Sequence, residues 1–165
     1  MVPSAFEVLL VLGMFITVTL GGCQKPSSRE GVETPLAMQD SARALHDRVR
    51  KAVEAGDSAA YMAEYAEEFI ALSDGEMVGG REHTAHDISD AFRSVKGWKA
   101  NFSEVHDETV GPRAAVSSLK FRLTGTDSAG KPVTLRGVWS GVLGVRNGRT
   151  VVLQQHLSHP RSSSR

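Results

Sequence analysis

A glutamine and a histidine stand next to each other in the last apolar segment of the chain, and both side chains could do chemistry there. Gln155 falls between Leu153 and Leu157 on the apolar side of an alternating pattern, whereas His156 points to the other side. A buried amide without a partner costs about 1–3 kcal/mol, so Gln155 should bind a ligand, a backbone group or an ordered water. His156 would be a candidate general base if the strand register were displaced by one residue.

A second group of polar side chains falls on a predicted helix. His83, His86 and Asp90 recur at spacings of three and four residues, as zinc ligands on one helix face can. They lie opposite the apolar stripe formed by Ile88 and Phe92, which is the pattern of an ordinary solvent-exposed face. We therefore expect no metal site, and no residue pattern in the sequence points to a cofactor.

The single cysteine, Cys23, ends an apolar segment near the N-terminus. Residues 8–20 carry no charge. A helix of that length reaches about 20 Å, which is short of the ~30 Å hydrocarbon core of a bilayer and suits the apolar region of a secretory signal. The first seven residues contain Glu7 and no lysine or arginine, which departs from the usual start of such a signal.

The residues Leu20-Gly21-Gly22-Cys23 resemble the lipobox of bacterial lipoproteins, in which signal peptidase II cleaves before the cysteine. The resemblance implies a signal peptide over residues 1–22 and an acylated Cys23, carrying fatty acid such as palmitate, as a membrane anchor. The implied location is the cell envelope, on the periplasmic or extracellular side. Gln24 after the cysteine is similar to lipoproteins sorted to the outer membrane where one exists. The alternative is a membrane-spanning helix followed by an incidental cysteine.

Composition excludes several classes of function. The 19 lysines and arginines balance the 19 aspartates and glutamates, so no field attracts nucleic acid, and none is expected as a partner. One cysteine allows no internal disulfide, and an acylated Cys23 leaves no thiolate for catalysis. Removal of the signal would leave about 140 residues, enough for one domain with one core.

The elements that must position the polar side chains begin with a helical half. Residues 23–34 are polar and predict a lipidated cysteine followed by a flexible tether, and residues 160–165 predict a disordered tail. Apolar residues at spacings of three and four predict a helix from Pro35 to the stop at Gly56. A short second helix should hold Tyr61, Met62 and Tyr65, and a third should run over residues 81–95.

A strand half follows, with a period of two from Trp98 onward. A strand is predicted at residues 69–72, and long strands over residues 114–124, 133–145 and 150–158. One face of the sheet should be buried, and the other exposed to water or paired with a second copy. Helices followed by an antiparallel sheet predict an α+β domain over residues 35–159. The apolar set occupies odd positions: Leu119, Phe121, Leu123, Val133, Leu135, Trp139, Leu143, Val151, Leu153 and Leu157.

Short motifs in a characteristic order resemble the SnoaL-like branch of the nuclear transport factor 2-like superfamily. The resemblance covers roughly Asp40 to Ser158 and implies a cone, in which a curved antiparallel sheet packs on about three N-terminal helices with a pocket at the open end. Many relatives are dimers, so a homodimer is one expectation. The motifs are Ala55-Gly56-Asp57, Tyr65-Ala66-Glu67-Glu68-Phe69, Gly80-Arg81-Glu82, Leu123-Thr124-Gly125-Thr126-Asp127, Leu135-Arg136-Gly137 and Asn147-Gly148-Arg149.

The catalytic groups of ketosteroid isomerase, a member of that superfamily, offer a test. Its chemistry needs a carboxylate base, a tyrosine and a protonated carboxylic acid. An ungapped count from Gly56-Asp57 places the tyrosine at Val49 and the base at Ser73. The acid would fall at Ser140 or Gly141, depending on a small gap, and none of these residues can do the job. Asp74 is next to the base position, but an offset of one residue in a strand turns a side chain to the opposite face.

Aromatic residues at helical and strand spacings could line an apolar cavity, although core packing is the usual role of such residues. The ligand-binding candidates are Tyr65, Trp139 and Gln155. Gly137 and Gly141 flank Trp139 on one face, where glycine either lets the sheet bend or leaves room for a ligand.

We therefore expect an envelope lipoprotein whose domain binds a small apolar molecule or serves as an accessory module, rather than an enzyme of the ketosteroid isomerase type. Two alternatives stay open. One is a pocket enzyme of isomerase, cyclase or hydrolase type that uses Asp74 or His156. The other is a module that assembles with another protein through the polar face of the sheet.

Overall fold

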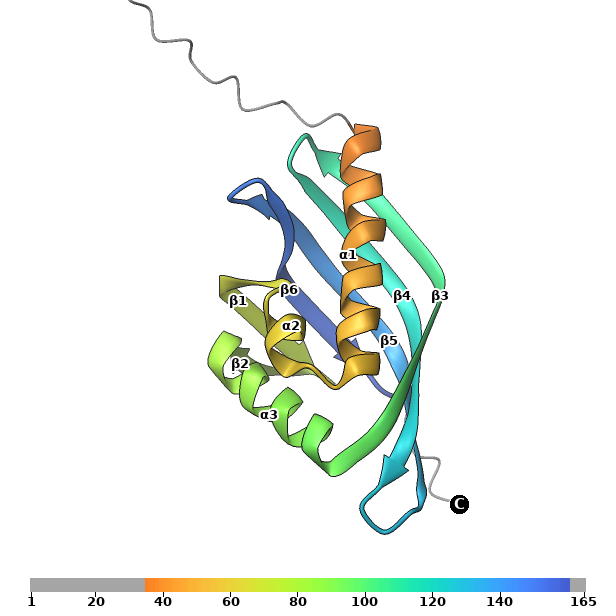
Figure 1. Ribbon diagram of the computed structural model, residues 1–165. Coiled ribbons are helices and arrows are strands. Elements are labelled where there is room, and N and C mark those ends of the chain that lie inside the picture. Colours follow the sequence, from red (N-terminus) through yellow and green to blue (C-terminus); the bar gives the residue numbers. More distant parts are fainter. Residues whose placement is uncertain (1–34, 161–165) are drawn as a thin grey trace, which may run out of the picture. The chain divides into compact units, whose positions relative to one another are not determined.

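The computed structural model describes residues 35–160, which form three helices and six strands (Figure 1). The predicted signal peptide, Cys23 and the tether, together with residues 161–165, lie outside the described residues. Within residues 35–160, no helix combines the length and apolarity needed to cross a membrane. The elements are α1 (Pro35–Ala55), α2 (Ser58–Met62), β1 (Tyr65–Ser73), β2 (Glu76–Gly80), α3 (Arg81–Ser94), β3 (Val95–Gly111), β4 (Ala114–Asp127), β5 (Pro132–Arg146) and β6 (Arg149–Ser158).

The strands form one sheet in the order β2-β1-β6-β5-β4-β3, which curves around the helices (Figure 1). Neighbouring strands are antiparallel except β1 and β6, which run parallel, so the sheet is mixed and not antiparallel as expected. The parallel pair arises because β2 and α3 follow β1 in the chain and separate it in sequence from the strands that complete the sheet. The last strand then inserts between β1 and β5.

The helix boundaries follow from the residues that end them. Gly56 adopts a φ of 65°, which glycine does without steric cost, and α1 stops before it. The side chain of Asp57 then accepts a hydrogen bond from the Ala60 N–H at 2.9 Å and caps α2. Tyr65 belongs to β1 rather than to α2, because the Glu64 carbonyl already accepts from the Val152 N–H of β6 at 2.8 Å.

Strand β2 has no counterpart among the predicted elements. Its five residues, Glu76–Gly80, end in two glycines and carry no apolar alternation. Pairing with β1 forms it, with Ile70 opposite Gly80 and Ser73 opposite Glu76.

The predicted alternation fails within β6. The register pairs Leu143 of β5 with Val152 and leaves Leu153 as an extra residue, which is a β-bulge. Val152 therefore joins the core, and the expectation that Val151 and Leu153 share the inner face is wrong. Gln155 lies beyond the bulge and keeps its inward orientation, buried as expected.

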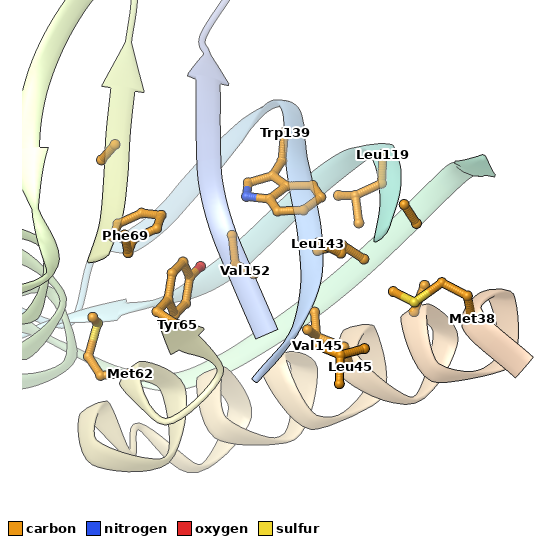
Figure 2. Close-up of a cluster of buried hydrophobic side chains, with 13 residues drawn as sticks. Met38, Leu45, Met62, Tyr65, Phe69, Leu119, Trp139, Leu143, Val145 and Val152 are labelled. Atoms are coloured by element: carbon orange, nitrogen blue, oxygen red, sulfur yellow. The ribbon is translucent and has the colours of Figure 1, made fainter. Parts of the chain in front are cut away.

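The core lies between the inner face of the sheet and the helices (Figure 2). A second, smaller cluster joins the end of α1 to α3 and the start of β3 through Val53, Phe92, Val95 and Trp98. The larger cluster is Met38, Ala42, Leu45, Met62, Tyr65, Phe69, Ala71, Ala115, Leu119, Trp139, Leu143, Val145 and Val152.

Candidate functional site

An apolar cavity of about 180 Å³ lies between the helices and the inner face of the sheet. Every helix and every strand of the described chain except β2 contributes a side chain to its wall. Most of these side chains are aliphatic or aromatic, among them Val49, Phe92, Leu119, Phe121 and Trp139. A cavity of roughly 150 Å³ lined by such residues holds benzene, so this one matches a molecule of about one ring with small substituents.

A hydrogen-bonded network forms one side of the cavity. The Tyr65 hydroxyl lies 2.7 Å from the Tyr61 hydroxyl and 3.1 Å from Oε1 of Gln155. The indole N–H of Trp139 donates to the same Oε1 at 3.0 Å. An indole nitrogen only donates, so the network fixes the Gln155 oxygen as the acceptor. Figure 2 shows Tyr65 and Trp139 on the same side of the sheet, on the strands that flank β6.

The hydroxyl protons of this network determine whether it can donate a hydrogen bond to a ligand. The Tyr65 hydroxyl has one proton and can serve either Gln155 or Tyr61. If it serves Gln155, Tyr61 donates to Tyr65. If it serves Tyr61, the Tyr61 proton is available to an acceptor in the cavity, which Tyr61 lines.

Both tyrosines are neutral donors at physiological pH. Burial raises the pKa of Tyr61, and the hydrogen bond from Tyr65 offsets part of that rise. The pKa of Tyr65 lies well above its usual value, first because of burial and then because of Tyr61 and Glu64. Neither hydroxyl can therefore act as a base.

Two glycines of β5 make room for the aromatic wall. A Cβ atom at Gly141 would lie 2.6 Å from the ring of Trp139, and one at Gly137 would lie 2.9 Å from the ring of Phe121. Both distances are too short for real contacts. The space above these glycines is thus occupied by side chains of the cavity wall rather than by a ligand.

His46 of α1 lines the cavity from the helix side. Its ring stands edge-on to Trp139, with 5.9 Å between the ring centroids. Its Nε2 atom lies 3.2 Å from Oδ1 of Asp107 and 3.0 Å from Oγ of Ser117. A carboxylate only accepts, so Nε2 carries the proton. A nucleophilic triad bridges serine and carboxylate through different ring nitrogens, whereas here both contact Nε2, which gives a hydrolase of that kind no support.

A second histidine–carboxylate pair lies where β1 and β6 end. The Oδ1 atom of Asp74 accepts from the backbone N–H of His159 at 3.0 Å, and Oδ2 lies 3.0 Å from Nδ1 of the same residue. These two hydrogen bonds, the backbone one first, lower the pKa of the Asp74 carboxyl group. His159 lines the cavity and stands edge-on to Phe121, with 6.1 Å between ring centroids.

The residues expected from sequence are placed as follows. Tyr65 and Trp139 line the cavity, and Gln155 joins them behind it. Asp74 lies in the turn after β1 and reaches the cavity only through His159. His156 is exposed and pairs with Ser140 across the outer face, so the structure does not bring it to the cavity.

Sequence reasoning missed both cavity histidines. His46 lies four residues after Ala42 and three before Val49, so it occupies a position of the apolar stripe of α1, and that was an available signal. His159 follows the last alternating residue of β6, and nothing in its neighbours marks it. Its contact with Asp74 depends on the parallel pairing of β1 with β6.

The polar residues of α3 remain on the surface. His83 and His86 are exposed, with ring nitrogens 3.3 Å from Asp87 and 3.5 Å from Asp90 respectively. Within the described part of the chain, no group of three or more histidine, cysteine, aspartate or glutamate side chains is arranged to hold a metal ion.

A curved sheet of six strands wrapped around three helices, with a cavity on its inner face, defines the nuclear transport factor 2-like α+β cone. Within this class, the chain belongs to the family of SnoaL-like domains, whose model matches residues 42–162. The family and the fold expected from the sequence motifs are confirmed. None of the curated proteins matches the chain.

Solved structures of several bacterial proteins share the fold. A nuclear transport factor 2-like protein from Salmonella enterica has 13% identity and a TM-score of 0.68, covering 79% of this chain and 96% of that one. A candidate scytalone dehydratase from Novosphingobium aromaticivorans has 10% identity and a TM-score of 0.69, covering 76% and 85%. A candidate calcium/calmodulin-dependent protein kinase II association domain from Xanthomonas campestris has 20% identity and a TM-score of 0.64, covering 73% and 86%. Such identities establish the fold and no activity.

Proposed function

We propose that this chain is a lipid-anchored envelope protein whose SnoaL-like domain binds a small, largely apolar molecule. The observation that carries the proposal is the cavity of about 180 Å³ on the inner face of the sheet. Its wall is apolar apart from the tyrosine pair, His46 and His159. Such a wall, with a few convergent polar groups, is the usual character of a small-molecule site.

The cavity also sets the expected size and affinity of the ligand. One ring with small substituents buries about 150–250 Å², as a phenylalanine side chain does. At about 25 cal/mol per Å², this burial contributes roughly 4–6 kcal/mol. The corresponding dissociation constant lies between roughly 0.05 and 1 mM before any hydrogen bond is added.

The tyrosine pair favours a ligand with one hydrogen-bond acceptor. Tyr61 can turn its proton into the cavity when Tyr65 donates to it. A carbonyl or ether oxygen on the ring would accept that proton. Aromatic ketones of one ring are therefore the class that the site suits best.

The proposed function does not include the chemistry of ketosteroid isomerase. Val49 lines the cavity at the position of the isomerase tyrosine and has no proton to donate. Ser73, at the position of the base, ends β1 and does not ionise. A binding or accessory role fits these residues better.

Membrane anchoring is the second part of the proposal and rests on Leu20-Gly21-Gly22-Cys23. Two or more acyl chains hold a protein stably at a bilayer. Cells fed an alkyne fatty acid should label the wild-type protein, and Cys23→Ser should abolish the label. Equal labelling of both proteins, or of neither, would show that Cys23 is not the anchor.

Ligand binding is tested by titrating residues 24–165 with acetophenone and following tryptophan fluorescence, since Trp139 lines the cavity. Val49→Trp should fill the cavity and abolish the titration. Val110→Trp is the matched control, because Val110 of β3 is 59% exposed and does not line the cavity. Absence of binding to the wild-type protein, or equal binding to both variants, would contradict the proposal.

The outer face of the sheet favours a homodimer as a further proposal. Ile70, Val116 and Val138 expose apolar side chains there, at 44%, 42% and 44% of their surface. These exposed side chains come from three strands, β1, β4 and β5. A second copy of this face would cover them.

A further inference from the structure

We propose that His159 is a general base at the edge of the cavity, positioned by Asp74, and that the domain removes a proton from a C–H acid bound there. The substrate would occupy the cavity of the proposed binding function, so this inference rests on that function. Nothing in the fold or the family match assigns a role to either residue.

The carboxylate of Asp74 fixes both the place and the tautomer of the imidazole. One oxygen holds the backbone N–H of His159 at 3.0 Å, and the other lies 3.0 Å from Nδ1. A carboxylate only accepts, so Nδ1 must be the protonated nitrogen. The lone pair of the neutral ring is then on Nε2, which has no hydrogen-bond partner within residues 35–160.

The turn that carries Asp74 is itself tied to the end of β6. Asp74 adopts a φ of 48° and donates its own N–H to the Leu157 carbonyl at 3.1 Å. Leu157 also lines the cavity. The pair is thus part of a hydrogen-bonded frame at the edge of the cavity, rather than a chance contact of two surface side chains.

The surroundings of the ring combine access with an apolar neighbour. The His159 side chain is 43% exposed, lines the cavity and meets the ring of Phe121 at 85°. A substrate can therefore bury its ring in the cavity and present a C–H bond to Nε2 at the edge. Asp74 does not line the cavity and acts only through His159, which makes it a positioning residue.

The other histidine of the cavity is less suited to this role. His46 is 8% exposed, and its protonated Nε2 contacts both Asp107 and Ser117. His159 has one nitrogen committed to a carboxylate and the other one open. This is the arrangement that activates a histidine as a base.

A nitrobenzisoxazole is a suitable probe, because its reaction needs only a base beside an apolar surface. The base takes the proton from the ring carbon next to nitrogen. The electrons of that C–H bond form the new π bond of a nitrile, and the N–O bond breaks with its electrons going to oxygen. The products are a cyano-nitrophenolate, which is coloured, and an imidazolium, which returns its proton to water. No oxidant or reductant is required.

The decisive comparison uses single substitutions in residues 24–165. His159→Gln should lower the enzyme-dependent rate by roughly 100-fold or more, as expected for loss of a general base. His86→Gln is the matched control, because His86 is exposed on α3 and should leave the rate unchanged. An equal rate in the wild type and in His159→Gln, or a loss that follows His156→Gln instead, would overturn the proposal.

Asp74→Asn tests whether Asp74 acts by fixing the tautomer of the His159 imidazole or only by holding the turn together. The amide oxygen can still accept the backbone N–H of His159, so the turn should hold. The amide NH₂ group would then face Nδ1 and favour the tautomer with its proton on Nε2, which removes the base. Nitrogen NMR of the imidazole should report an Nδ1–H tautomer in the wild type and an Nε2–H tautomer in the variant. An Nε2–H tautomer in the wild type would contradict the assignment.

Acetophenone titration of the same proteins distinguishes the two ways of failing. If the wild type binds acetophenone but its elimination rate does not depend on His159, the base assignment is wrong and the binding function stands. If the wild type neither binds acetophenone nor accelerates the elimination, the proposed binding function fails, and this inference fails with it.

Discussion

Replacing Tyr61 by phenylalanine isolates the one proton that the tyrosine pair can offer to a ligand. The substitution keeps the ring, which packs against Tyr65 with 5.1 Å between centroids and against Phe92 at 6.1 Å. The Tyr65 hydroxyl keeps an acceptor, because Oε1 of Gln155 lies 3.1 Å away. No buried donor is stranded, so we expect a change in folding free energy of less than about 1 kcal/mol.

The effect on binding should depend on the ligand. A hydrogen bond of this kind contributes about 0.5–1.5 kcal/mol, so acetophenone should bind roughly 2- to 13-fold more weakly to Tyr61→Phe. Ethylbenzene has a similar shape without the acceptor and should bind the variant and the wild type equally.

The assay is a calorimetric or fluorescence titration of both ligands with both proteins. Tyr65→Phe serves as the contrasting variant, since it removes a donor of Gln155 while leaving the Tyr61 hydroxyl in place. Tyr65→Phe should destabilise the fold by about 1–2 kcal/mol in urea, because Tyr65 is buried and bonded twice. Equal weakening of acetophenone and ethylbenzene by Tyr61→Phe would refute the reasoning, because it would mean lost packing rather than a lost proton.

Three further predictions concern stability and assembly. Glu64→Gln should cost about 1–3 kcal/mol in urea, because the buried carboxylate binds Arg48 and Arg149, whereas Glu67→Gln, at an exposed site, should cost almost nothing. The lowered pKa of Asp74 means that its contribution to stability is fully present above about pH 4 and is lost as the pH falls through its lower folded-state pKa, so acid should reduce the protection of the His159 amide against exchange in the wild type but not in Asp74→Asn. Light scattering should find a dimer that Val138→Glu converts to a monomer, and an unchanged mass would argue against the outer-face interface.

The helices and the long strands β4 and β5 could be predicted because their signals are local. The apolar stripe of α1, the stop at Gly56 and the cap at Asp57 all act within a few residues of the element that they define. Alternation along β4 and β5 likewise identified the inner face, which contains Leu119 and Trp139. These features follow from the periods of helix and strand alone.

The bulge in β6 could not be predicted in the same way. Val151, Val152 and Leu153 form a continuous apolar run that does not mark the bulge, and the odd-numbered alternation of the other strands assigns Val151 and Leu153 to the inner face. The register of the partner strand decides otherwise, since Leu143 pairs with Val152. Gln155 escapes the error because it lies on the far side of the bulge.

The candidate site depends on the parallel pairing of β1 with β6, which local sequence patterns do not predict. That pairing brings Tyr65 to Gln155 across 90 residues of sequence and Asp74 to His159 across 85. By strand alternation alone, Asp74 would face away from the position of the isomerase base. His159 lies beyond the end of the last strand. Only when the two strand ends lie side by side does the carboxylate reach the imidazole. A base for this cavity therefore has to be sought among pairs of residues at neighbouring strand ends, and not at the position where another member of the superfamily keeps its carboxylate.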